Sequence, residues 1–561
     1  VFDKENPTLF KAAESIRPEF VVEVSGKIAE RSDETKNLQM PTGKIEVVVI
    51  DCKILSKSET PPFMITEKTS RANEGSESEA PEGLNVDEDI RLKYRYLDLR
   101  RQSMQRNLIK RSQFIKIIRD YLDKFQFTDI ETPVLTKSTP EGARDYLVPS
   151  RLHEGKCYAL PQSPQLFKQL LMISGFERYY QVVKCFRDED LRPNRQPEFT
   201  QLDIEASFID EEFIYDLIEG LIVKLFDHEG VTLEAPFPRI TYAESMDKYG
   251  NDHPDLRFGY EMINVTHLLG DVNFKVFNAI VKSGGMIKAI NLKGQADKLS
   301  KNMLQEDLAK KVIPKLGGKG LAWMKMEEGK LNSNIVQFFS EDEQASLVDA
   351  MSAENGDVLI FIADTSHALV NDVLGRFRCY IAERLGIIDQ TLFVPCWVVD
   401  FPMFEWKDGR ASSLHHPFTQ PSGPIPSQSD RESILAMQSR AYDIVINGEE
   451  VGGGSIRIHD TDMQEKVFGL LGLSTEEIRE KFGFFVDALK YGAPPHGGIA
   501  LGLDRLTAMI LRLSSIREVI AFPKNRVASC PLTQAPSTVD NDQLSELHLK
   551  AVQKTPSEVS V

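Results

Sequence analysis

Two strand-like segments separated by a charged loop dominate the hydrophobic pattern of the chain. Residues 179–186 are rich in aromatic and β-branched side chains, which favours a strand. From 199 to 208, polar and apolar positions alternate, as in a strand with two different faces. The apolar face is predicted to be core and comprises Leu202, Ile204, Ala206 and Phe208. The opposite face carries Phe199, Gln201, Asp203 and Glu205.

The loop between these segments mixes charges of both signs. Its polar residues include Arg187, Asp188, Glu189, Arg192, Arg195 and Gln196. Arginine forks bind phosphate oxygens and carboxylates hold Mg²⁺, so the loop suits a polyphosphate that carries a divalent metal. A ring on the polar face, Phe199, suits stacking against a base. An ordinary hairpin with a charged outer face remains the alternative on these residues alone.

Two further segments place polar residues where they can meet a ligand. In 160–172, Pro164 fits the first turn of a helix, and Gln165 and Lys168 then share one face. In 446–459, INGEEVGGGSIRIH, a strand pair carries Glu450 and Arg457 on either side of three glycines. The glycines allow the backbone to pass close to a ligand, and they also fit a β-bulge.

The segment 497–506, GGIALGLDRL, predicts a strand that turns directly into a helix. Gly502 permits the tight turn, and Arg505 falls in the first helical turn. A helix N-terminus attracts phosphate, and Arg505 adds a full positive charge. Earlier in the chain, 108–125 predicts a helix with a single apolar stripe.

The rest of the chain divides by composition and periodicity. Residues 1–60 read as β structure, and 66–89 form an acidic, Ser/Gly/Pro-rich linker. From 258 to 392 the chain has alternating units of its own, which predict a separate α+β insertion. Its strand-like stretches are KAINLKG (288–294), NIVQFFS (334–340) and VLIFIAD (358–364). The chain after residue 536 is polar and tail-like.

Composition narrows the function classes. A chain of 561 residues predicts several domains, and it has no run of 18 apolar residues that could cross a membrane. The six cysteines are scattered without a CxxC pair, which predicts free thiols and a cytoplasmic location. The formal net charge is −17, so any binding of RNA requires local basic patches.

Three segments together resemble the motifs of a class II aminoacyl-tRNA synthetase. FRDEDLRPNRQPEFTQLDIE, 186–205, is similar to motif 2, and most closely to that of the bacterial and organellar aspartyl-tRNA synthetases. The helix 108–125 with the following FTDIETPVL resembles motif 1, and 497–506 resembles motif 3. The similarity runs from about Phe20 to Pro536.

This resemblance implies an α+β fold with an antiparallel-sheet catalytic core. It implies an anticodon-binding OB-fold β-barrel over 1–65, whose first strands would precede Val1, and a linker or hinge over 66–105. The catalytic core would comprise 106–257 and 393–536, interrupted by the insertion domain at 258–392 and followed by a tail at 537–561.

The resemblance also implies an activity, namely attachment of L-aspartate to tRNA(Asp) through an aspartyl-adenylate, with release of AMP and pyrophosphate. Charging of tRNA(Asn) stays open. The implied substrates and cofactor are ATP, L-aspartate, tRNA and Mg²⁺, and the implied assembly is a homodimer away from membranes. Arg187, Glu450 and Arg505 would be catalytic.

The remaining site residues carried over by the resemblance fall into three groups. ATP would contact Arg187, Asp188, Glu189, Gln196, Phe199, Glu450, Gly502, Leu503, Asp504 and Arg505. Aspartate would contact Glu141, Gln165, Lys168, Arg187, His415 and Arg457. Mg²⁺ would be held by Asp203 and Glu450, with Glu205 nearby on the same face.

Two alternatives belong beside this interpretation. An asparaginyl or lysyl enzyme of the same class shares motifs 2 and 3, but not Arg457 and Lys168 together with this insertion. A non-catalytic RNA-binding relative should have lost Arg187, Glu450 or Arg505, and all three are present.

Overall fold

A computed structural model describes most of the chain. The described residues are 1–3, 5–38, 40, 42–65, 86–139, 142–192, 194–270, 272–407, 409–427 and 430–552. The chain divides into two compact units. The first comprises Val1–Leu108, Ala521–Asn525 and Ser529–Pro536, and the second comprises Ile109–Ile520, Arg526–Ala528 and Ser537–Val561.

The first unit contains an antiparallel strand pair, β1 with β2. Its elements are α1 (Pro7–Ser15), β1 (Val21–Glu30), β2 (Ile45–Ser56), α2 (Glu88–Lys93) and α3 (Arg95–Asp98). Several apolar side chains of the pair are exposed, including Ile28 at 72% and Ile50 at 61%. The OB-fold barrel therefore stays a prediction. In the predicted linker, 66–85 lie outside the described residues, whereas α2 and α3 pack around the buried Asp98, which pairs with three arginines.

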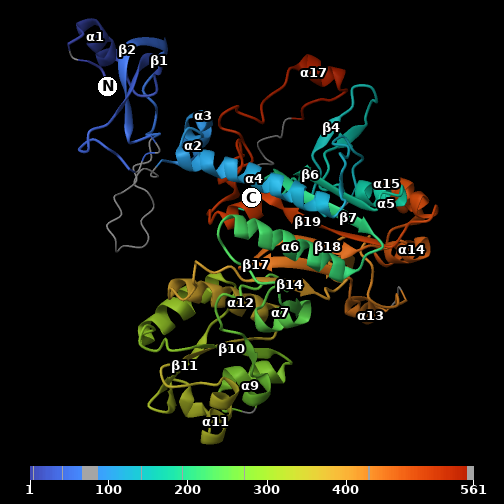
Figure 1. The fold of residues 1–561 in the computed structure, drawn as a ribbon. Coiled ribbons are helices and arrows are strands. Elements are labelled where there is room, and N and C mark those ends of the chain that lie inside the picture. The colour runs from blue at the N-terminus through green and yellow to red at the C-terminus, as the bar shows by residue number, and fades with distance from the viewer. Residues whose placement is uncertain are drawn as a thin grey trace. The chain divides into compact units, whose positions relative to one another are not determined.

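An eight-stranded, mostly antiparallel sheet forms the centre of the second unit (Figure 1). Its spatial order is β3 (Thr128–Asp129), β6 (Arg178–Phe186), β7 (Glu198–Ser207), β19 (His496–Gly502), β18 (Glu449–Ile456), β17 (Ala441–Ile446), β14 (Pro395–Val399) and β8 (Arg239–Thr241). Only the two pairs at its ends, β3 with β6 and β14 with β8, are parallel among the described strands. This confirms the predicted antiparallel core.

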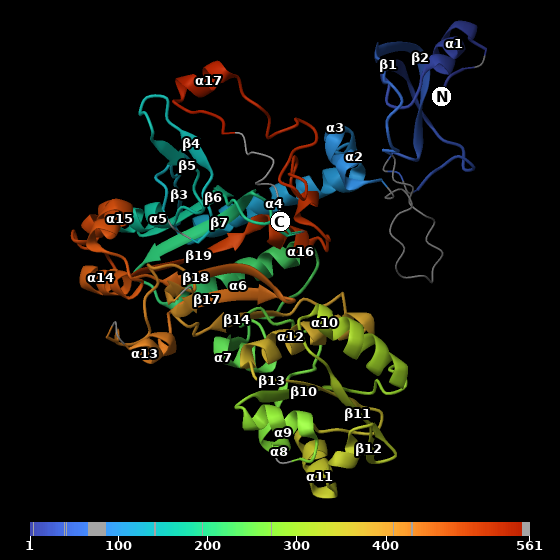
Figure 2. The ribbon, with the colours of Figure 1, turned by 180° about the vertical axis from the view of Figure 1, so that it is seen from behind.

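Helices cover one face of this sheet and form its hydrophobic core. They are α4 (Gln102–Lys124), α6 (Glu211–His228) and α16 (Leu503–Ile510). Phe114, Ile118 and Leu122 of α4 are buried there, as the apolar stripe predicts. Figure 1 shows α6 lying across the strands, and Figure 2 shows β7 and β19 from the other side.

Strand β7 confirms most of the predicted alternation. Leu202, Ile204 and Ala206 are fully buried in the core under the helices. The prediction was wrong for Phe208, which lies beyond the end of β7 with a φ of 59° and 72% exposure. The main chain turns there, because the Phe208 N–H donates to Pro495 O and no longer continues the pairing with β6.

Smaller elements surround the sheet. They are β4 (Leu147–Pro149), β5 (Cys157–Ala159), α5 (Gln165–Ile173), α7 (Tyr242–Lys248), β15 (Phe404–Lys407), β16 (Arg410–Ser413), α13 (Arg431–Ala436), α14 (Thr461–Leu470), α15 (Thr475–Leu489), η3 (Ile516–Glu518) and α17 (Asn541–Glu546). Helix α5 packs on β7, which brings its polar side to the same sheet face as Asp203.

The stretch predicted as an insertion builds a sheet of its own, with antiparallel order β12-β11-β13-β10-β9. Its elements are β9 (Ile263–Asn264), α8 (Thr266–Leu269), α9 (Lys275–Lys282), β10 (Met286–Leu292), the π-helix η1 (Met303–Val312), α10 (Ile313–Lys315), β11 (Ala322–Glu327), β12 (Lys330–Asn332), the 3₁₀ helix η2 (Val336–Phe338), α11 (Glu341–Ala350), β13 (Val358–Asp364) and α12 (His367–Arg384).

Each face of this second sheet has its own hydrophobic core. The expectation of a strand in 334–340 was wrong, because Val336–Phe338 forms a 3₁₀ turn. Strands β11 and β12 lie just before it instead, and the paired β10 and β13 agree with the two other strand-like stretches. No helix in the described parts of the chain combines the length and apolar character needed to cross a membrane.

Candidate active site

The candidate site lies on the sheet face opposite α6. Because Leu202 and Ile204 point into the core, their neighbours Asp203 and Glu205 point to the other face. Two adjoining cavities open there, the first of about 200 Å³ and the second of about 430 Å³. The two are parts of one continuous site, because both are lined by Arg187, Glu189, Gln201, Glu450 and Ala500.

The first cavity gathers most of the residues predicted to contact a nucleotide. They are Arg187, Glu189, Gln196, Phe199, Glu450, Gly502, Asp504 and Arg505. The guanidinium of Arg187 lies 5.1 Å from the centre of the Phe199 ring. Gly502 ends β19 and precedes α16, so Arg505 occupies the first turn of that helix as predicted. Arg505 donates to Glu450 O, which ties α16 to β18.

Three of the predicted nucleotide contacts have other partners. The Leu503 side chain is buried in the core with α6. Asp504 is 3% exposed and binds Arg111 of α4 at 2.6 Å and the Thr200 N–H at 2.7 Å, so it joins the helix to β7. Asp188 pairs with Arg144 and is absent from the lining of both cavities within the described residues.

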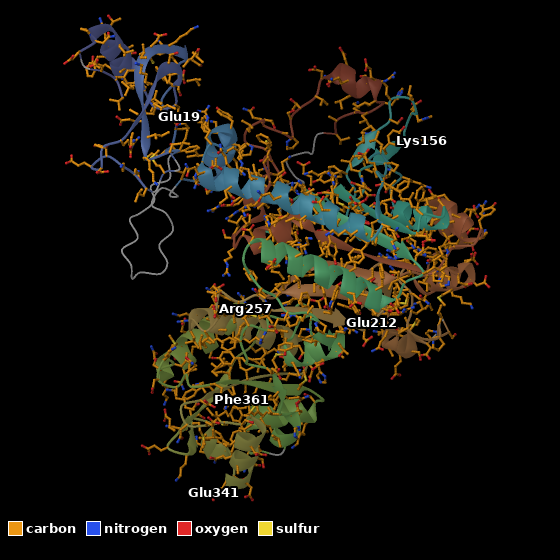
Figure 3. All side chains as sticks on the ribbon, viewed as in Figure 1. Glu19, Lys156, Glu212, Arg257, Glu341 and Phe361 are labelled. Carbon is orange, nitrogen blue, oxygen red and sulfur yellow. The ribbon has the colours of Figure 1, made fainter. Side chains whose placement is uncertain are left out.

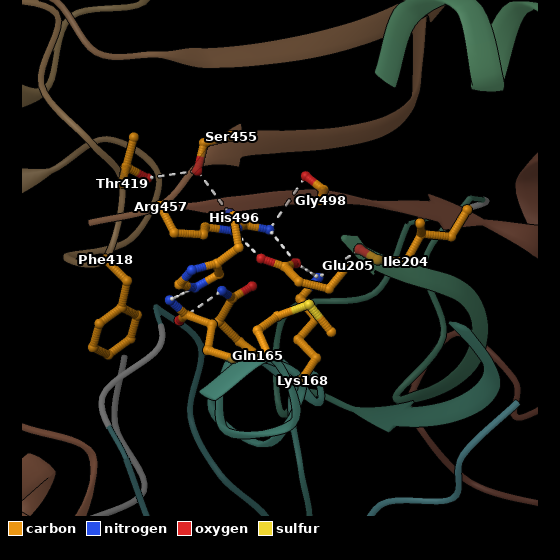
Figure 4. A network of polar contacts seen from close by, with 12 residues as sticks. Gln165, Lys168, Ile204, Glu205, Phe418, Thr419, Ser455, Arg457, His496 and Gly498 are labelled. Carbon is orange, nitrogen blue, oxygen red and sulfur yellow. Dashed lines mark hydrogen bonds and ion pairs between the residues drawn. The ribbon is translucent and has the colours of Figure 1, made fainter. Parts of the chain in front are cut away.

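The second cavity contains two cations that are already paired with carboxylates (Figure 4). Lys168 of α5 lies 2.9 Å from Asp203 and 3.1 Å from Glu205. Arg457 donates from Nε and Nη2 to the two oxygens of Glu205, at 2.9 and 3.2 Å. The side chains of all four are at most 2% exposed. We call these four residues, Lys168, Asp203, Glu205 and Arg457, the charge quartet.

The last nitrogen of Arg457 contacts a histidine that sequence reasoning missed. Nη1 donates to His416 Nε2 at 2.6 Å and to Ser455 Oγ at 2.7 Å. The other ring nitrogen, Nδ1, accepts from the Phe418 N–H at 3.2 Å, so both ring nitrogens of His416 face donors. Burial lowers the pKa of His416 well below its ordinary value, and the charge of Arg457 adds to the effect. His416 is therefore a neutral acceptor, the partner of Arg457 that a substrate carboxylate can most easily replace.

The two carboxylates of the quartet differ in pKa. Burial raises the pKa of Asp203 to about 6, against the charge of Lys168. Burial acts in the same direction on Glu205, but Arg457 and Lys168 outweigh it and lower the pKa of Glu205 to about 2. Glu205 is therefore the permanent anion that orients Arg457, and Asp203 is the carboxyl that can take up a proton near neutrality.

His415, predicted to contact aspartate, lies at the wall of the second cavity. Its ring packs edge-on against Phe401 at 4.7 Å. Burial lowers the pKa of His415 to about 4, so its imidazole is neutral at physiological pH. Gln165 lines the same cavity as predicted. Glu141, the remaining predicted aspartate contact, lies outside the described residues.

The floor beneath the quartet is main chain. A methyl group added at Gly498 of β19 would lie 2.1 Å from Glu205 Oε2, and one at Gly454 of β18 would lie 2.1 Å from Gly498 O. Both distances are far inside van der Waals contact, so the absence of side chains here is what allows Glu205 to lie flat against the sheet. The glycine run thus serves close approach, and a register irregularity beside it, between Ile444 and Val445, matches the bulge interpretation as well.

Comparison with known proteins supplies the family. The model of class II tRNA synthetases (D, K and N) matches residues 87–526. The chain belongs to this family. An aspartate–tRNA(Asp/Asn) ligase of Syntrophus aciditrophicus is 55% identical over 542 residues, 96% of this chain and 74% of that protein. Another from Aquifex aeolicus is 50% identical over 567 residues, 99% of this chain and 91% of that protein.

A solved structure supports the synthetase fold. Asparaginyl-tRNA synthetase from Entamoeba histolytica, in complex with asparaginyl-adenylate, covers 92% of this chain and 85% of its own. The TM-score is 0.53 at 17% identity, which shows the class II synthetase fold alone. Class II synthetases use ATP, in agreement with the expected substrate.

In this synthetase, Asp443 of β17 is a further carboxylate that sequence reasoning missed. It is buried and lines the second cavity together with Glu450. A methyl group added at Gly453 would lie 2.3 Å from Asp443 Oδ1 and 3.7 Å from Glu450 Oε1, so the two carboxylates converge over this glycine. Burial and the charge of Glu450 raise the pKa of Asp443 well above its ordinary value. Two carboxyl groups that converge in this way fit a divalent cation, whose charge would keep both of them ionised.

The predicted metal pair of Asp203 and Glu450 fits less well in the synthetase. Asp203 has Lys168 at 2.9 Å, and an ammonium group so close opposes a second cation. Among the described residues, no group of three or more His, Cys, Asp or Glu could hold a metal ion. Mg²⁺ does not require such a group, because it typically binds one or two carboxylates together with substrate phosphates.

Proposed function

We propose that the chain attaches L-aspartate to tRNA(Asp) in two steps, using ATP. In the first step an oxygen of the aspartate α-carboxylate bonds to the α-phosphorus of ATP, and the bond to pyrophosphate breaks. In the second step a 3′-terminal hydroxyl of the tRNA attacks the aspartyl carbonyl, and AMP leaves. The observation that carries this proposal is the charge quartet, because it presents two fixed cations in the second cavity.

The two cavities divide the substrates between them. The first offers Phe199 for stacking with adenine and Arg187 and Arg505 for the phosphates. The second offers Arg457 and Lys168 to the side-chain carboxylate of aspartate, and the neutral His416 is the acceptor that this carboxylate replaces at Arg457. The α-ammonium group of aspartate would contact Gln165 and, by resemblance, Glu141.

Arg187 is well placed to serve both substrates, because it lines both cavities. Where the cavities join, it can neutralise charge that develops at the α-phosphate during attack. Asp443 and Glu450 would hold Mg²⁺, which, when bound, screens phosphate charge and orients pyrophosphate for departure. Catalysis of this kind depends on positioning and charge rather than on a general base.

The quartet also accounts for selection of aspartate over asparagine. Glu205 fixes the direction of the Arg457 fork, and Ser455 holds its remaining nitrogen when the substrate carboxylate takes the place of His416. Asparagine would present a neutral amide to these cations in place of a carboxylate. Loss of such a charge-assisted pairing costs about 2–5 kcal/mol. Discrimination between amino acids therefore needs no separate hydrolytic site.

The experiment that tests the function is ATP–pyrophosphate exchange with each amino acid. We expect exchange to depend on L-aspartate and Mg²⁺. Exchange driven by lysine or asparagine but not by aspartate would overturn the proposal. Charging assays with purified tRNA(Asp) and tRNA(Asn) would then show whether the enzyme accepts both tRNAs, as the names of two similar proteins state for those proteins.

We also propose that two copies of the chain associate. Apolar side chains are exposed on the hairpin β4–β5 and on the segment bridged to it at Thr136, namely Val134 (48%), Leu135 (53%), Leu147 (59%) and Tyr158 (39%). Exposed apolar side chains on adjoining segments are a feature of interfaces. All six cysteines are free thiols, which supports the proposed cytoplasmic location.

A further inference from the structure

A short loop at the edge of the second cavity is clamped by the insertion. The loop, residues 250–254, joins α7 to the chain that enters the insertion sheet. Asp252 of this loop lines the second cavity with His415 and Asp443. Asp252 belongs to none of the sequence motifs, and none of these motifs assigns a task to the insertion.

The clamp is Arg378 of helix α12, which is fully buried. It donates to four main-chain carbonyl groups that follow the loop, those of Asp255, Phe258, Gly259 and Tyr260, at 3.0–3.4 Å. Its guanidinium also lies 4.9 Å from the ring of Tyr249, just before the loop. A single side chain therefore holds both ends of the loop.

Close packing of main chain against main chain reinforces the clamp. A methyl group added at Gly250 would lie 2.2 Å from Asn371 O of α12. From α7, Ser245 Oγ donates to Asn251 O of the loop at 2.7 Å. On the site side, His253 Nδ1 donates to Gly448 O at 2.9 Å, in the turn that leads to Glu450. The loop is thus fixed between α12 and the β17–β18 turn. Figure 3 marks Arg257, which follows the loop, where the insertion meets the core.

We propose that Arg378 is a positioning residue for amino acid binding and that Asp252 is the site residue it positions. The insertion then contributes to the reaction by forming one wall of the second cavity. Asp252 places a negative charge at the wall formed by His415 and Asp443, and this charge helps hold the cationic end of the amino acid. The inference rests on the proposed function, because it assigns the second cavity to aspartate.

The test compares aspartate binding with ATP binding in single and double variants of the full chain. Asp252→Asn removes the charge, and Arg378→Lys keeps the charge but removes the planar fork. We expect each to raise the Kd for aspartate, measured by calorimetry, and the aspartate KM in pyrophosphate exchange, by about 5- to 20-fold, the loss of one charge-assisted contact. The ATP KM should stay within about twofold, because Asp252 is absent from the lining of the first cavity.

The double variant distinguishes positioning from general weakening. If Arg378 acts through Asp252, the Kd of the double variant for aspartate should be no higher than that of the single variant with the higher Kd. Independent effects would instead multiply the two increases in Kd. Arg376→Lys is the control on the same helix, because Arg376 is exposed and pairs with Asp372. Asp247→Asn is the control for lost stability, since it removes the ion pair to Lys288 of β10, another contact between insertion and core, without touching the loop.

Three outcomes would overturn the inference. One is an unchanged aspartate Kd in Asp252→Asn. Another is multiplication of the two effects in the double variant. The third is an equal rise of the aspartate KM in Asp247→Asn, which would mean that any loosened insertion has the same effect.

Should Arg378→Lys fail to fold, Ser245→Ala replaces it, because it frees the loop at Asn251 while leaving the clamp in place. We expect Ser245→Ala also to raise the Kd for aspartate. An unchanged Kd in this variant would contradict the proposal. If the wild-type enzyme shows no exchange with aspartate at all, the proposed function fails. If the wild-type enzyme does show exchange with aspartate and the variants leave aspartate binding unchanged, the failure is confined to this inference.

Discussion

The two cavities differ in the state of their cations before any substrate is bound. In the first, Arg505 is 29% exposed and lies 3.9 Å from Glu449, and Arg195 is 46% exposed although it pairs with Glu189 at 3.2 Å. In the second, Lys168 and Arg457 are buried and lie within 3.2 Å of carboxylates. The nucleotide side can therefore attract phosphates by charge and adjust to them. The amino acid side instead holds its cations in one geometry, and selection comes from that geometry.

The largest effect that would break this comparison is expected from Arg457→Gln. It removes the fork and leaves Glu205 buried without its main partner. We expect kcat/KM for aspartate in pyrophosphate exchange to fall by about 10²- to 10³-fold, equivalent to about 3–4 kcal/mol. The ATP KM should change little, and an equal loss of ATP binding would show that Arg457 does not belong to the amino acid side.

Arg440→Gln is the matched control for that variant. Arg440 also makes a two-pronged pair with a carboxylate, Glu211, at 2.6 and 2.7 Å. It is absent from the lining of the two cavities within the described chain. If Arg440→Gln lowered aspartate use as strongly, the loss would come from weakened folding and not from the lost fork.

A smaller effect, on the nucleotide side alone, is expected from Phe199→Ala. Stacking of a base on an aromatic ring contributes about 1–3 kcal/mol, so the ATP KM should rise by about 5- to 150-fold. The aspartate KM should stay within about twofold. Phe208→Ala is the control, because Phe208 is exposed just beyond the same strand and outside the lining of the first cavity. A shift in the aspartate KM equal to that in the ATP KM would contradict the division of substrates.

The smallest expected effect is on the pH dependence of folding stability, which should differ between the two carboxylates of the quartet. The folded pKa of Asp203 is about 6, above its ordinary value of 3.8. The folded protein therefore binds more protons than the unfolded chain between about pH 4 and 6, and the contribution of Asp203 to stability falls as pH rises through that window. Glu205, with a folded pKa of about 2 against 4.5, stabilises above about pH 4.5 and loses this contribution as pH falls toward 2.

Thermal unfolding of the wild type, Asp203→Asn and Glu205→Gln between pH 4 and 8 measures this difference. The midpoint of the wild type relative to Asp203→Asn should fall as pH rises from 4 to 6 and then stay constant. The difference in unfolding midpoint between the wild type and Glu205→Gln should stay at its full value across the upper part of the pH 4–8 range. Parallel curves for the two variants would mean that the two carboxyl groups titrate alike.

Local periodicity predicted much of this site. The alternation of β7 places Asp203 and Glu205 on one face, and the helical spacing of Gln165 and Lys168 brings both to the second cavity. Gly502 and Arg505 follow from the strand-to-helix turn. These patterns work because each concerns residues within a turn or a strand of one another, where backbone geometry alone determines the shared face.

Long-range pairing could not be predicted in the same way. Periodicity marks Glu205 as polar, but its role as the anchor of Arg457 depends on strands that are 252 residues apart in the chain. Asp443 and Asp252 carry no local signal, because one lies in a buried strand and the other in a loop. Asp504 lines the first cavity, but its pairing with Arg111, which lies 393 residues away, could not be predicted. Such contacts arise from strand order, which a single sequence specifies only through the complete fold.

The main-chain floor under the quartet limits how this enzyme can change over time. Gly454 and Gly498 are so close to neighbouring oxygens that every other amino acid would displace the strands or Glu205. We therefore expect any substitution at the floor to disturb the site before it can alter substrate choice. New specificity has to arise at the rim, among side chains such as His416, Asp252 and Gln165 that contact the ligand space without supporting the sheet. The floor can be inherited unchanged while the rim is free to diverge.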